Sequence, residues 1–231
     1  MPEVNFKPLP TDYQELISAL KKHIELSEKY ITDFESYHFN RTREKAVIYC
    51  LRHVVDLAKG GLATSLAELP DSLTTLSRAS LETLFWARYV TISNENAQEF
   101  TDSTLNEMKR TSRKNLIAGY AKVYDIKTNN DKTKEILNSP LMKDIPKRVS
   151  IETAAQLGGL ERVYTNLYGF ISMVAHGRAF ELRTKPDNKD EIFASTSATL
   201  GALQCVEIIS ADWIIHRIQT PKETLIQILG V

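Results

Sequence analysis

PDSLTTLSRASLETLFWARYVTIS, residues 70–93, is the stretch of sequence that decides the fold. At about 100° per residue, its apolar side chains spread around the whole circumference of a helix. They are Leu73, Leu76, Ala79, Leu81, Leu84, Phe85, Trp86, Val90 and Ile92. A helix that is apolar on every side is buried in the middle of a fold. Pro70 suits the first position of such a helix, because its missing N–H group would have no partner there. The stretch therefore predicts a central helix packed among other helices.

Helical periodicity continues on both sides of this stretch. We expect a first helix from about Thr11 to Tyr37, because Thr11 and Gln14 have the spacing of a capping box. Further helices are expected at about 41–66, 95–124, 160–176 and 197–219, with a short one at 150–157. Gly60-Gly61 indicates either a loosened helix end or a close crossing. The sequence predicts an all-α fold, an antiparallel bundle of five or six long helices with short accessory helices.

The chain shows no internal repeat and no linker, so we predict one helical domain over residues 1–231. Within it we expect an extended N-terminal segment at 1–10, an irregular insert at 125–159 and a charged loop at 178–196. The two proline residues and the Asn-Asn-Asp run of the insert are typical of turns rather than of a long helix.

Composition narrows the functional classes. Lys plus Arg and Asp plus Glu number 29 each, so no overall field draws the chain to nucleic acid or to a membrane. Cys50 and Cys205 lie in apolar helical patterns, which indicates reduced core cysteines. Residues 1–10 lack the pattern of a signal peptide. A helix that spans a membrane needs a long uninterrupted apolar run, and no run in this chain is long enough. We expect a soluble, cytoplasmic protein without a membrane partner.

The central helix also carries charge. Arg78, Glu82 and Tyr89 fall within roughly 40° of one another on a helical wheel. Burying a charge costs several kcal/mol unless the charge is paired. Either Arg78 and Glu82 form an ion pair that fixes the packing, or they line a cleft.

A polar stripe follows the expected helix at 160–176. Its members are Arg162, Thr165, Gly169, Ser172 and His176, at spacings of three and four. His176 would end the helix, where the helix dipole favours the protonated ring and raises its pKa. Gly177 suits a C-cap, and Arg178 follows at once. His176 is therefore either a structural helix end or a reactive group.

A third stripe lies on the helix at 41–66, where Tyr49, His53 and Asp56 share a face. Asp56 has the spacing to accept a hydrogen bond from His53 and orient its ring. A surface pair without a function is the alternative.

Metal and nucleotide chemistry find little support in the sequence. Metal sites in bundles pair two Glu-x-x-His motifs, and Glu35 with His38 is one such spacing without a second. Phosphate-binding glycine loops and Gly-x-Ser-x-Gly elbows are missing as well. We expect neither a metal nor a cofactor.

Four basic residues crowd one and a half turns of the polar helix at 95–124: Lys109, Arg110, Arg113 and Lys114. They form either a solvated helix face or a contact for the phosphates of RNA, which would bind in a salt-dependent way.

Two short motifs carry a resemblance. The run SRASLE at 77–82, after the helix with His53, and the run YGFISMVAHG at 168–177 resemble uncharacterised bacterial helical proteins with an Arg-x-x-x-Glu helix and a later Ser-x-x-x-His-Gly helix end. That group is similar to the HEPN superfamily of helical bundles. Many HEPN proteins are metal-independent ribonucleases of toxin–antitoxin and phage-defence systems, in which two protomers complete the site.

The resemblance implies roles for several residues. His176 would act as general acid or base, Arg78 or Arg178 would stabilise the phosphorane, and Glu82 would orient one of them. Ser172 and Tyr168 would be supporting donors. HEPN ribonucleases, however, carry Arg four to six residues before His, whereas the nearest Arg upstream of His176 is Arg162.

Two hypotheses follow. The first is a homodimeric HEPN-like defence or toxin protein that cleaves or binds RNA without a metal ion. The alternative is a non-catalytic interaction, sensor or antitoxin-like subunit that binds a cognate protein, in which Arg78 and Glu82 belong to the core.

Overall fold

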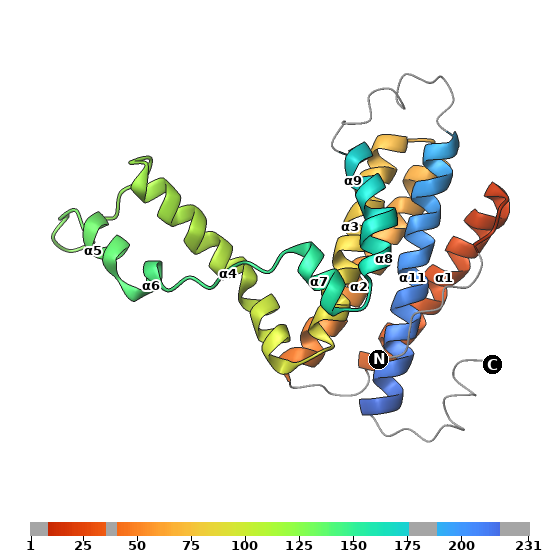
Figure 1. Cartoon of the computed structure of the whole chain (residues 1–231), viewed down its shortest axis with the longest axis horizontal. Helices are drawn as coiled ribbons and strands as arrows, with labels where there is room; N and C mark the ends of the chain where they lie inside the picture. The colour runs from red at the N-terminus through yellow and green to blue at the C-terminus, as the bar shows by residue number, and fades with distance from the viewer. Residues whose placement is uncertain (1–8, 36–40, 176–188, 218–231) are drawn as a thin grey trace.

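The computed structural model describes residues 9–35, 41–175 and 189–217, with the backbone alone for 174 and 211–217. The fold is all-α, and the described residues contain no strand. In chain order its elements are α1 (Tyr13–Glu35), α2 (Thr42–Leu66), α3 (Pro70–Val90), α4 (Asn94–Ile117), α5 (Thr133–Asn138), α6 (Pro140–Lys143), α7 (Ile151–Leu157), α8 (Glu161–Val163), the π-helical turn η1 (Tyr164–Tyr168), α9 (Gly169–Ala175) and α11 (Lys189–Arg217). Figure 1 shows α1, α2, α3 and α11 side by side in one bundle.

Helix α3 lies at the centre of this bundle, as predicted. It packs against α2, α11, α7, α9 and the first turns of α4. Leu73, Leu81, Leu84 and Phe85 are all fully or almost fully buried. Pro70 stands at the first turn of the helix. Because neighbours cover α3 on several sides, it needs apolar residues around its circumference.

The first helix is capped one residue later than expected and begins at Tyr13. The side chain of Asp12, not of Thr11, accepts hydrogen bonds from the backbone N–H groups of Gln14 and Glu15, at 2.8 and 3.0 Å. The predicted capping box of Thr11 and Gln14 is therefore wrong, and a carboxylate, which is the stronger acceptor for these groups, takes its place.

The glycine pair in α2 marks a close crossing rather than a loosened end. A Cβ atom on Gly60 would lie 3.2 Å from Leu76 of α3, and one on Gly61 would lie 3.4 Å from Thr199 of α11. The helix itself continues unbroken to Leu66. Small residues here let three helices approach one another.

The expected helix at 160–176 is interrupted. After the three residues of α8 the backbone forms the π-helical turn η1, and α9 follows. A π turn holds one more residue than an α turn and therefore rotates what comes after it. As a result Tyr168 is buried, whereas Phe170, two residues later, is 43% exposed.

Helix α11 begins earlier than predicted. We expected a charged loop at 178–196 and a helix from 197, but residues 189–196 are already helical, and 178–188 lie outside the described residues. Asp190 and Glu191 in the first turn suit the positive end of the helix dipole.

Hydroxyl groups hold this early part of α11 in place. Ser195 lies 3.0 Å from Thr74, Thr196 lies 2.9 Å from Ser65, and all four are buried. Thr74 also donates to Glu191 over 2.9 Å. The polar residues that resembled a loop are thus the satisfied polar contacts of a core helix.

By length and composition alone, Lys189–Ser210 of α11 is apolar enough to cross a membrane, which we did not expect. Its Ser, Thr, Gly and Ala residues interrupt the apolar run without adding charge. The bundle buries 72% of this window. Cys205 on α11 and Cys50 on α2 are free and buried, as predicted.

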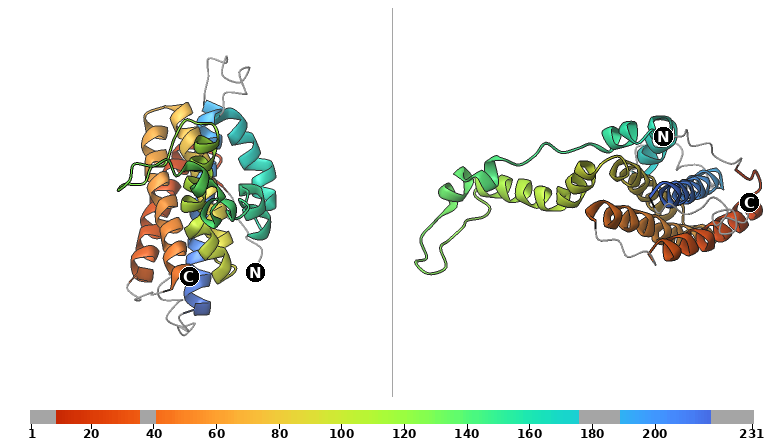
Figure 2. Two further views of the ribbon diagram at one scale, coloured as in Figure 1. Left: turned by 90° about the vertical axis from the view of Figure 1, so that its left-hand side faces the viewer. Right: turned by 90° about the horizontal axis from the view of Figure 1, so that it is seen from below.

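Residues 103–149 form a projection that we call the arm. Helix α4 leaves the bundle and carries α5 and α6 at its far end, from which the chain returns to α7 (Figures 1 and 2). We expected α4 to reach Tyr124, but it ends at Ile117, and Gly119 follows with a φ of 75°. Glycine adopts this conformation at little cost, which makes it a natural helix end.

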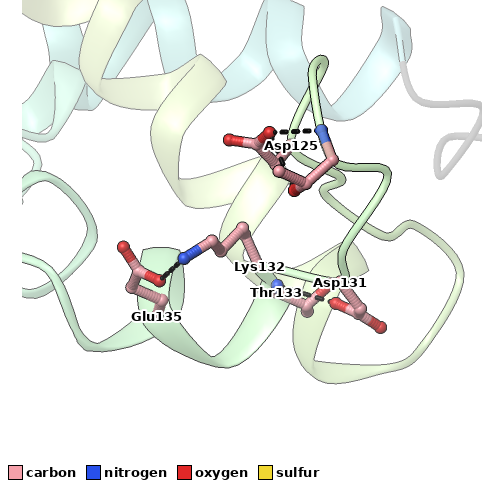
Figure 3. A network of polar contacts seen from close by, with 6 residues as sticks. Asp125, Asp131, Lys132, Thr133 and Glu135 are labelled. Carbon is pink, nitrogen blue, oxygen red and sulfur yellow. Dashed lines mark hydrogen bonds and ion pairs between the residues drawn. The ribbon is translucent and has the colours of Figure 1, made fainter.

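The tip of the arm is held by polar contacts (Figure 3). Asp125 accepts hydrogen bonds from the backbone N–H groups of Lys127 and Thr128, at 3.0 and 2.8 Å. Lys132 contacts Glu135 at 2.6 Å. An antiparallel bridge joins Tyr124 to Asp131, so the turn closes on itself. These contacts make the tip a structured turn within the expected irregular insert.

Charge is unevenly divided between the arm and the rest of the chain. Residues 103–149 contain 11 Lys and Arg but only 5 Asp and Glu, whereas the whole chain has 29 of each kind. The arm therefore has six positive charges in excess, and the remaining residues have six negative charges in excess. The two excess charges cancel, so the net charge of the whole chain is zero.

Candidate functional site

The first candidate site joins α3 to η1 through Arg78, Glu82 and Tyr168. Nη2 of Arg78 lies 2.9 Å from a carboxylate oxygen of Glu82. The hydroxyl of Tyr168 donates to the same oxygen over 2.7 Å and accepts from Arg78 over 3.4 Å. The expected i,i+4 ion pair is therefore present, and a tyrosine from a distant segment completes it.

The π turn and aromatic packing together position Tyr168. Its ring stacks on Tyr164 with centroids 5.2 Å apart and meets the edge of Phe85 at 5.6 Å. The guanidinium carbon of Arg78 lies 5.8 Å from the centroid of the same ring, within the range of a cation–π contact. Tyr168 is thus held by its ring, and its hydroxyl is directed to the charged pair.

The ion pair of Arg78 and Glu82 is more exposed than a purely structural core pair and less exposed than a pair on an open surface. The side chains of Arg78 and Glu82 are 28% and 35% exposed, so the pair is neither dry nor fully solvated. Burial would lower the pKa of Arg78, but the hydrogen bond to Tyr168 and the charge of Glu82 outweigh it, and the pKa is raised. Burial and the bond to Glu82 raise the pKa of Tyr168. Arg78 therefore stays charged and Tyr168 stays neutral at neutral pH.

Arg78 retains unused donors. A guanidinium has five N–H donors, and the contacts with Glu82 and Tyr168 use only those on Nη2. Nε is buried without a hydrogen-bond partner in the described part of the chain. Because Nε is buried, a further ligand of this pair would bind Nη1, which neither contact uses.

Tyr89 is not part of this group, although its helical angle placed it there. Its hydroxyl donates to Glu99 of α4 over 2.6 Å, and burial, followed by this bond, raises its pKa. The shared angle is real, but α4 covers this end of α3 and α9 covers the other.

The remaining residues of the predicted catalytic set lie on or beyond α9. Ser172 is half-buried on α9, four residues after Tyr168. His176 and Arg178 lie outside the described residues. In sequence, Tyr168, Ser172 and His176 follow one another at intervals of four.

The three residues of the stripe on α2 do not form one group: Tyr49 and His53 contact each other, whereas Asp56 contacts other residues. Tyr49 and His53 stack with centroids 6.1 Å apart and rings inclined by 19°. Asp56 does not orient His53; its carboxylate lies 3.9 Å from Lys59, which also pairs with Glu28 of α1. Asp56 is 72% exposed, and the described residues show no hydrogen bond between it and His53, so the predicted orienting contact is not formed.

The basic cluster on α4 is also divided. The guanidinium of Arg110 pairs with Glu107 at 3.0 Å and donates to the backbone oxygen of Pro146, across the arm. Lys109 is half-exposed, and Arg113 and Lys114 are exposed. Arg110 therefore ties the returning segment to α4, and the other three remain available to a ligand.

Sequence reasoning missed two clefts beside α4. One, of about 600 Å³, is lined by Arg110, Lys147 and Arg148 among others, and the second, of about 610 Å³, is lined by Lys45, Tyr49 and His53 among others. Both are lined by Trp86, Phe100, Ser103 and Thr104. Trp86 and Phe100 fit the apolar pattern of a core helix, so the sequence alone does not show that they line a cleft.

No group of three or more His, Cys, Asp and Glu side chains arranged for a metal ion occurs in the part of the chain that the structure describes. The comparisons with known proteins add one match. The model of a protein family, described as a family of unknown function (DUF5677), matches residues 44–192, more than half of the chain. No curated protein matches the chain. No solved structure matches it either.

Proposed function

The chain belongs to this family of unknown function (DUF5677), so its function must be inferred from its own residues. We propose that it is a HEPN-like bacterial defence or toxin protein that cleaves RNA without a metal ion. The residues in question, from Arg78 to Arg178, all lie within the matched region. Two protomers acting together would follow the HEPN pattern.

The proposed reaction is attack by a 2′-hydroxyl on the adjacent phosphate. A general base removes the 2′-hydroxyl proton, the 2′-oxygen bonds to phosphorus, and the bond from phosphorus to the 5′-oxygen breaks. A general acid supplies the proton to that 5′-oxygen, so the products are a 2′,3′-cyclic phosphate and a 5′-hydroxyl. His176 serves as one of these two groups. Arg78 stabilises the charge on the phosphorane, with Arg178 as the alternative cation.

The observation that carries this proposal is the shared contact of Arg78, Glu82 and Tyr168. Glu82 and the Tyr168 hydroxyl fix the guanidinium of Arg78, which is partly open to solvent and whose Nη1 these contacts do not use. A fixed cation is worth more to a developing charge than a mobile one, because it needs no reorganisation during the reaction. Ser172, one turn after Tyr168, is a further donor on the same segment.

The test is cleavage of single-stranded RNA by the wild type and by His176→Ala and Arg78→Lys variants. Loss of a general acid or base lowers the rate by about 10²–10⁴-fold, so His176→Ala should be nearly inactive. Arg78→Lys keeps the charge but loses the planar fork, and we expect an intermediate loss. Cleavage should survive a chelator and leave a 2′,3′-cyclic phosphate.

A change of a neighbouring residue controls for misfolding. Met173 lies beside Ser172 and is 42% exposed, so Met173→Ala should cleave RNA like the wild type. An inactive wild type, or a His176→Ala variant as active as its parent, would overturn the proposal.

The second candidate is a non-catalytic interaction subunit, and the apolar surface of the arm favours it. Several large apolar side chains are exposed there: Leu105, Met108, Ile117, Tyr120, Tyr124, Ile126 and Leu141. Exposed apolar groups gathered on one projection are typical of a protein interface. A second copy of the chain is the partner to test first.

Light scattering in solution tests this candidate. If the arm is the interface, the wild type should be a dimer, and Met108→Glu with Ile117→Glu should give a folded monomer. A monomeric wild type would remove the second copy as the partner.

A further inference from the structure

We propose that the two clefts beside α4 form one groove that binds single-stranded RNA, with unpaired bases stacked on its aromatic side chains. Trp86, Phe100, Ser103 and Thr104 line both clefts and so form their common wall. The choice of RNA rather than DNA rests on the function proposed above, whereas the recognition of base and phosphate rests on the groove itself.

The aromatic side chains of this groove form a continuous series. His53 stacks on Tyr49, Tyr49 lies 6.3 Å from Phe100, and Phe100 lies 5.6 Å from Trp86. These rings come from α2, α3 and α4. Tyr49 is 61% exposed, so one face of the series is available for stacking. Proteins that bind single strands commonly offer such rings, because every base has a π face.

The charges along the groove fit a polyanion. Lys45 lines one cleft, and Arg110, Lys147 and Arg148 line the other. The two acidic side chains of the lining are already engaged, Glu99 by the hydroxyl of Tyr89 and Glu107 by Arg110. Lys45, Lys147 and Arg148 are all exposed. Positive charge thus borders both ends of the aromatic series.

The groove lies on a different face of α3 from the Arg78 group, because Trp86 and Thr83 are about 80° and 100° around the helix from Arg78 and Glu82. Trp86 follows Arg78 on α3 by a little more than two helical turns. Thr83, which lines the groove, follows Glu82 directly. The groove thus binds the strand away from the reacting phosphate.

The experiment measures the affinity of the His176→Ala protein for a labelled ten-nucleotide single-stranded RNA, so that no cleavage interferes. Tyr49→Ala removes an exposed ring at no cost to the core. One base stacked on an aromatic ring contributes about 1–3 kcal/mol, so binding should weaken by about 5- to 150-fold. Tyr120→Ala is the matched control, because Tyr120 is 86% exposed on the arm and lines neither cleft.

A second measurement reports on the groove directly. The chain has two tryptophans, so a Trp213→Phe background leaves Trp86 as the only indole. Stacking of a base should quench its fluorescence when RNA is added, with the same midpoint as the affinity measurement. A duplex RNA of the same length should bind more weakly, because its bases are not free to stack.

Adenosine monophosphate separates a strand from a free nucleotide. The proposal requires the oligonucleotide to bind far more tightly; equal affinities would assign the groove to a mononucleotide and overturn it. No quenching of Trp86, or equal affinities for the Tyr49→Ala and Tyr120→Ala variants, would also overturn it. If binding depends on Tyr49 but the wild-type protein does not cleave RNA, the proposed RNA-binding groove is supported and the proposed ribonuclease activity is contradicted.

Discussion

At the scale of single residues, Nη2 of Arg78 serves two partners, because Glu82 and Tyr168 both lie within its reach. The hydroxyl of Tyr168 also donates to Glu82, so the carboxylate keeps a hydrogen bond if the arginine is removed. The sequence predicted the pair, and the resemblance gave Tyr168 a supporting role. The contact itself could not be predicted, since it joins residues 90 positions apart.

We expect Arg78→Ala to lower the free energy of unfolding by about 1 kcal/mol, because solvent screens a partly exposed pair. Removal of one partner from a fully buried pair costs more, about 3–5 kcal/mol. Urea unfolding measures the difference, with Arg113→Ala at an exposed position as the control. A decrease in the range of a fully buried pair would mean that Arg78 and Glu82 are shielded from water in solution.

The two thiols predict how stability changes with pH. Burial raises the pKa of Cys50 and Cys205 from 9.0 to about 12. Above pH 9 the unfolded chain loses these protons while the folded chain keeps them. The stabilisation is therefore complete below pH 9 and declines as the pH rises towards 12, by at most about 1.4 kcal/mol per pH unit for each thiol.

Urea unfolding at pH 8, 9 and 10 tests this expectation. The variant with both Cys50→Ala and Cys205→Ala should start from a lower stability, because two cavities are created, but should show a flatter pH dependence. Parallel curves for the two proteins would show that the thiols titrate normally in the fold.

At the scale of elements, Gly158 is where α7 touches α3. A Cβ atom there would lie 2.8 Å from Cβ of Arg88, and Nε of Arg88 donates to the Gly158 oxygen over 3.1 Å. We expect Gly158→Ala to cost about 1–3 kcal/mol, because one of the two helices must move. Thermal unfolding measures it.

Gly169→Ala is the matched change. Its Cβ atom would meet only the backbone oxygen of Tyr164, at 3.7 Å. That distance is an ordinary van der Waals contact, so the variant should be as stable as the wild type or up to about 1 kcal/mol more stable. Equal losses in the two variants would contradict the close contact at Gly158.

The helices that could be predicted are those whose own residues mark them, without contacts from other parts of the chain. The α3 stretch is apolar around its circumference and begins with Pro70, and both features follow from the chain itself. The start of α11 could not be predicted, because Ser195 and Thr196 are satisfied by hydroxyls from α2 and α3. The π turn at 164–168 has no sequence pattern of its own. The groove at Trp86 depends on how far α4 lies from the bundle, which no single segment specifies.

At the scale of the whole molecule, the basic residues of the arm would extend the proposed RNA-binding groove. We expect the combined changes Lys109→Gln, Arg113→Gln and Lys114→Gln to weaken RNA binding and to reduce its dependence on salt. For single strands the slope of log affinity against log salt falls by about 0.7 for each phosphate that the protein no longer neutralises. Arg110 stays unchanged, because it contacts Pro146.

The control removes three charges from the bundle, those of Lys21, Lys22 and Lys29, which are exposed on α1. Titrations at several salt concentrations compare the two sets. Equal slopes would show that RNA responds to overall charge rather than to the arm.

The separation of charge between the arm and the bundle has a consequence for the behaviour of many molecules together. With a sequence pI of about 7.0 and opposite excess charges in different regions, the protein is a strong electric dipole at neutral pH. Dipolar molecules attract one another head to tail when few ions screen them, over distances of about 30 Å at 0.01 M salt and about 8 Å at 0.15 M. Solubility should therefore be lowest near pH 7 in dilute buffer and rise as salt is added, the reverse of what a uniformly charged protein does.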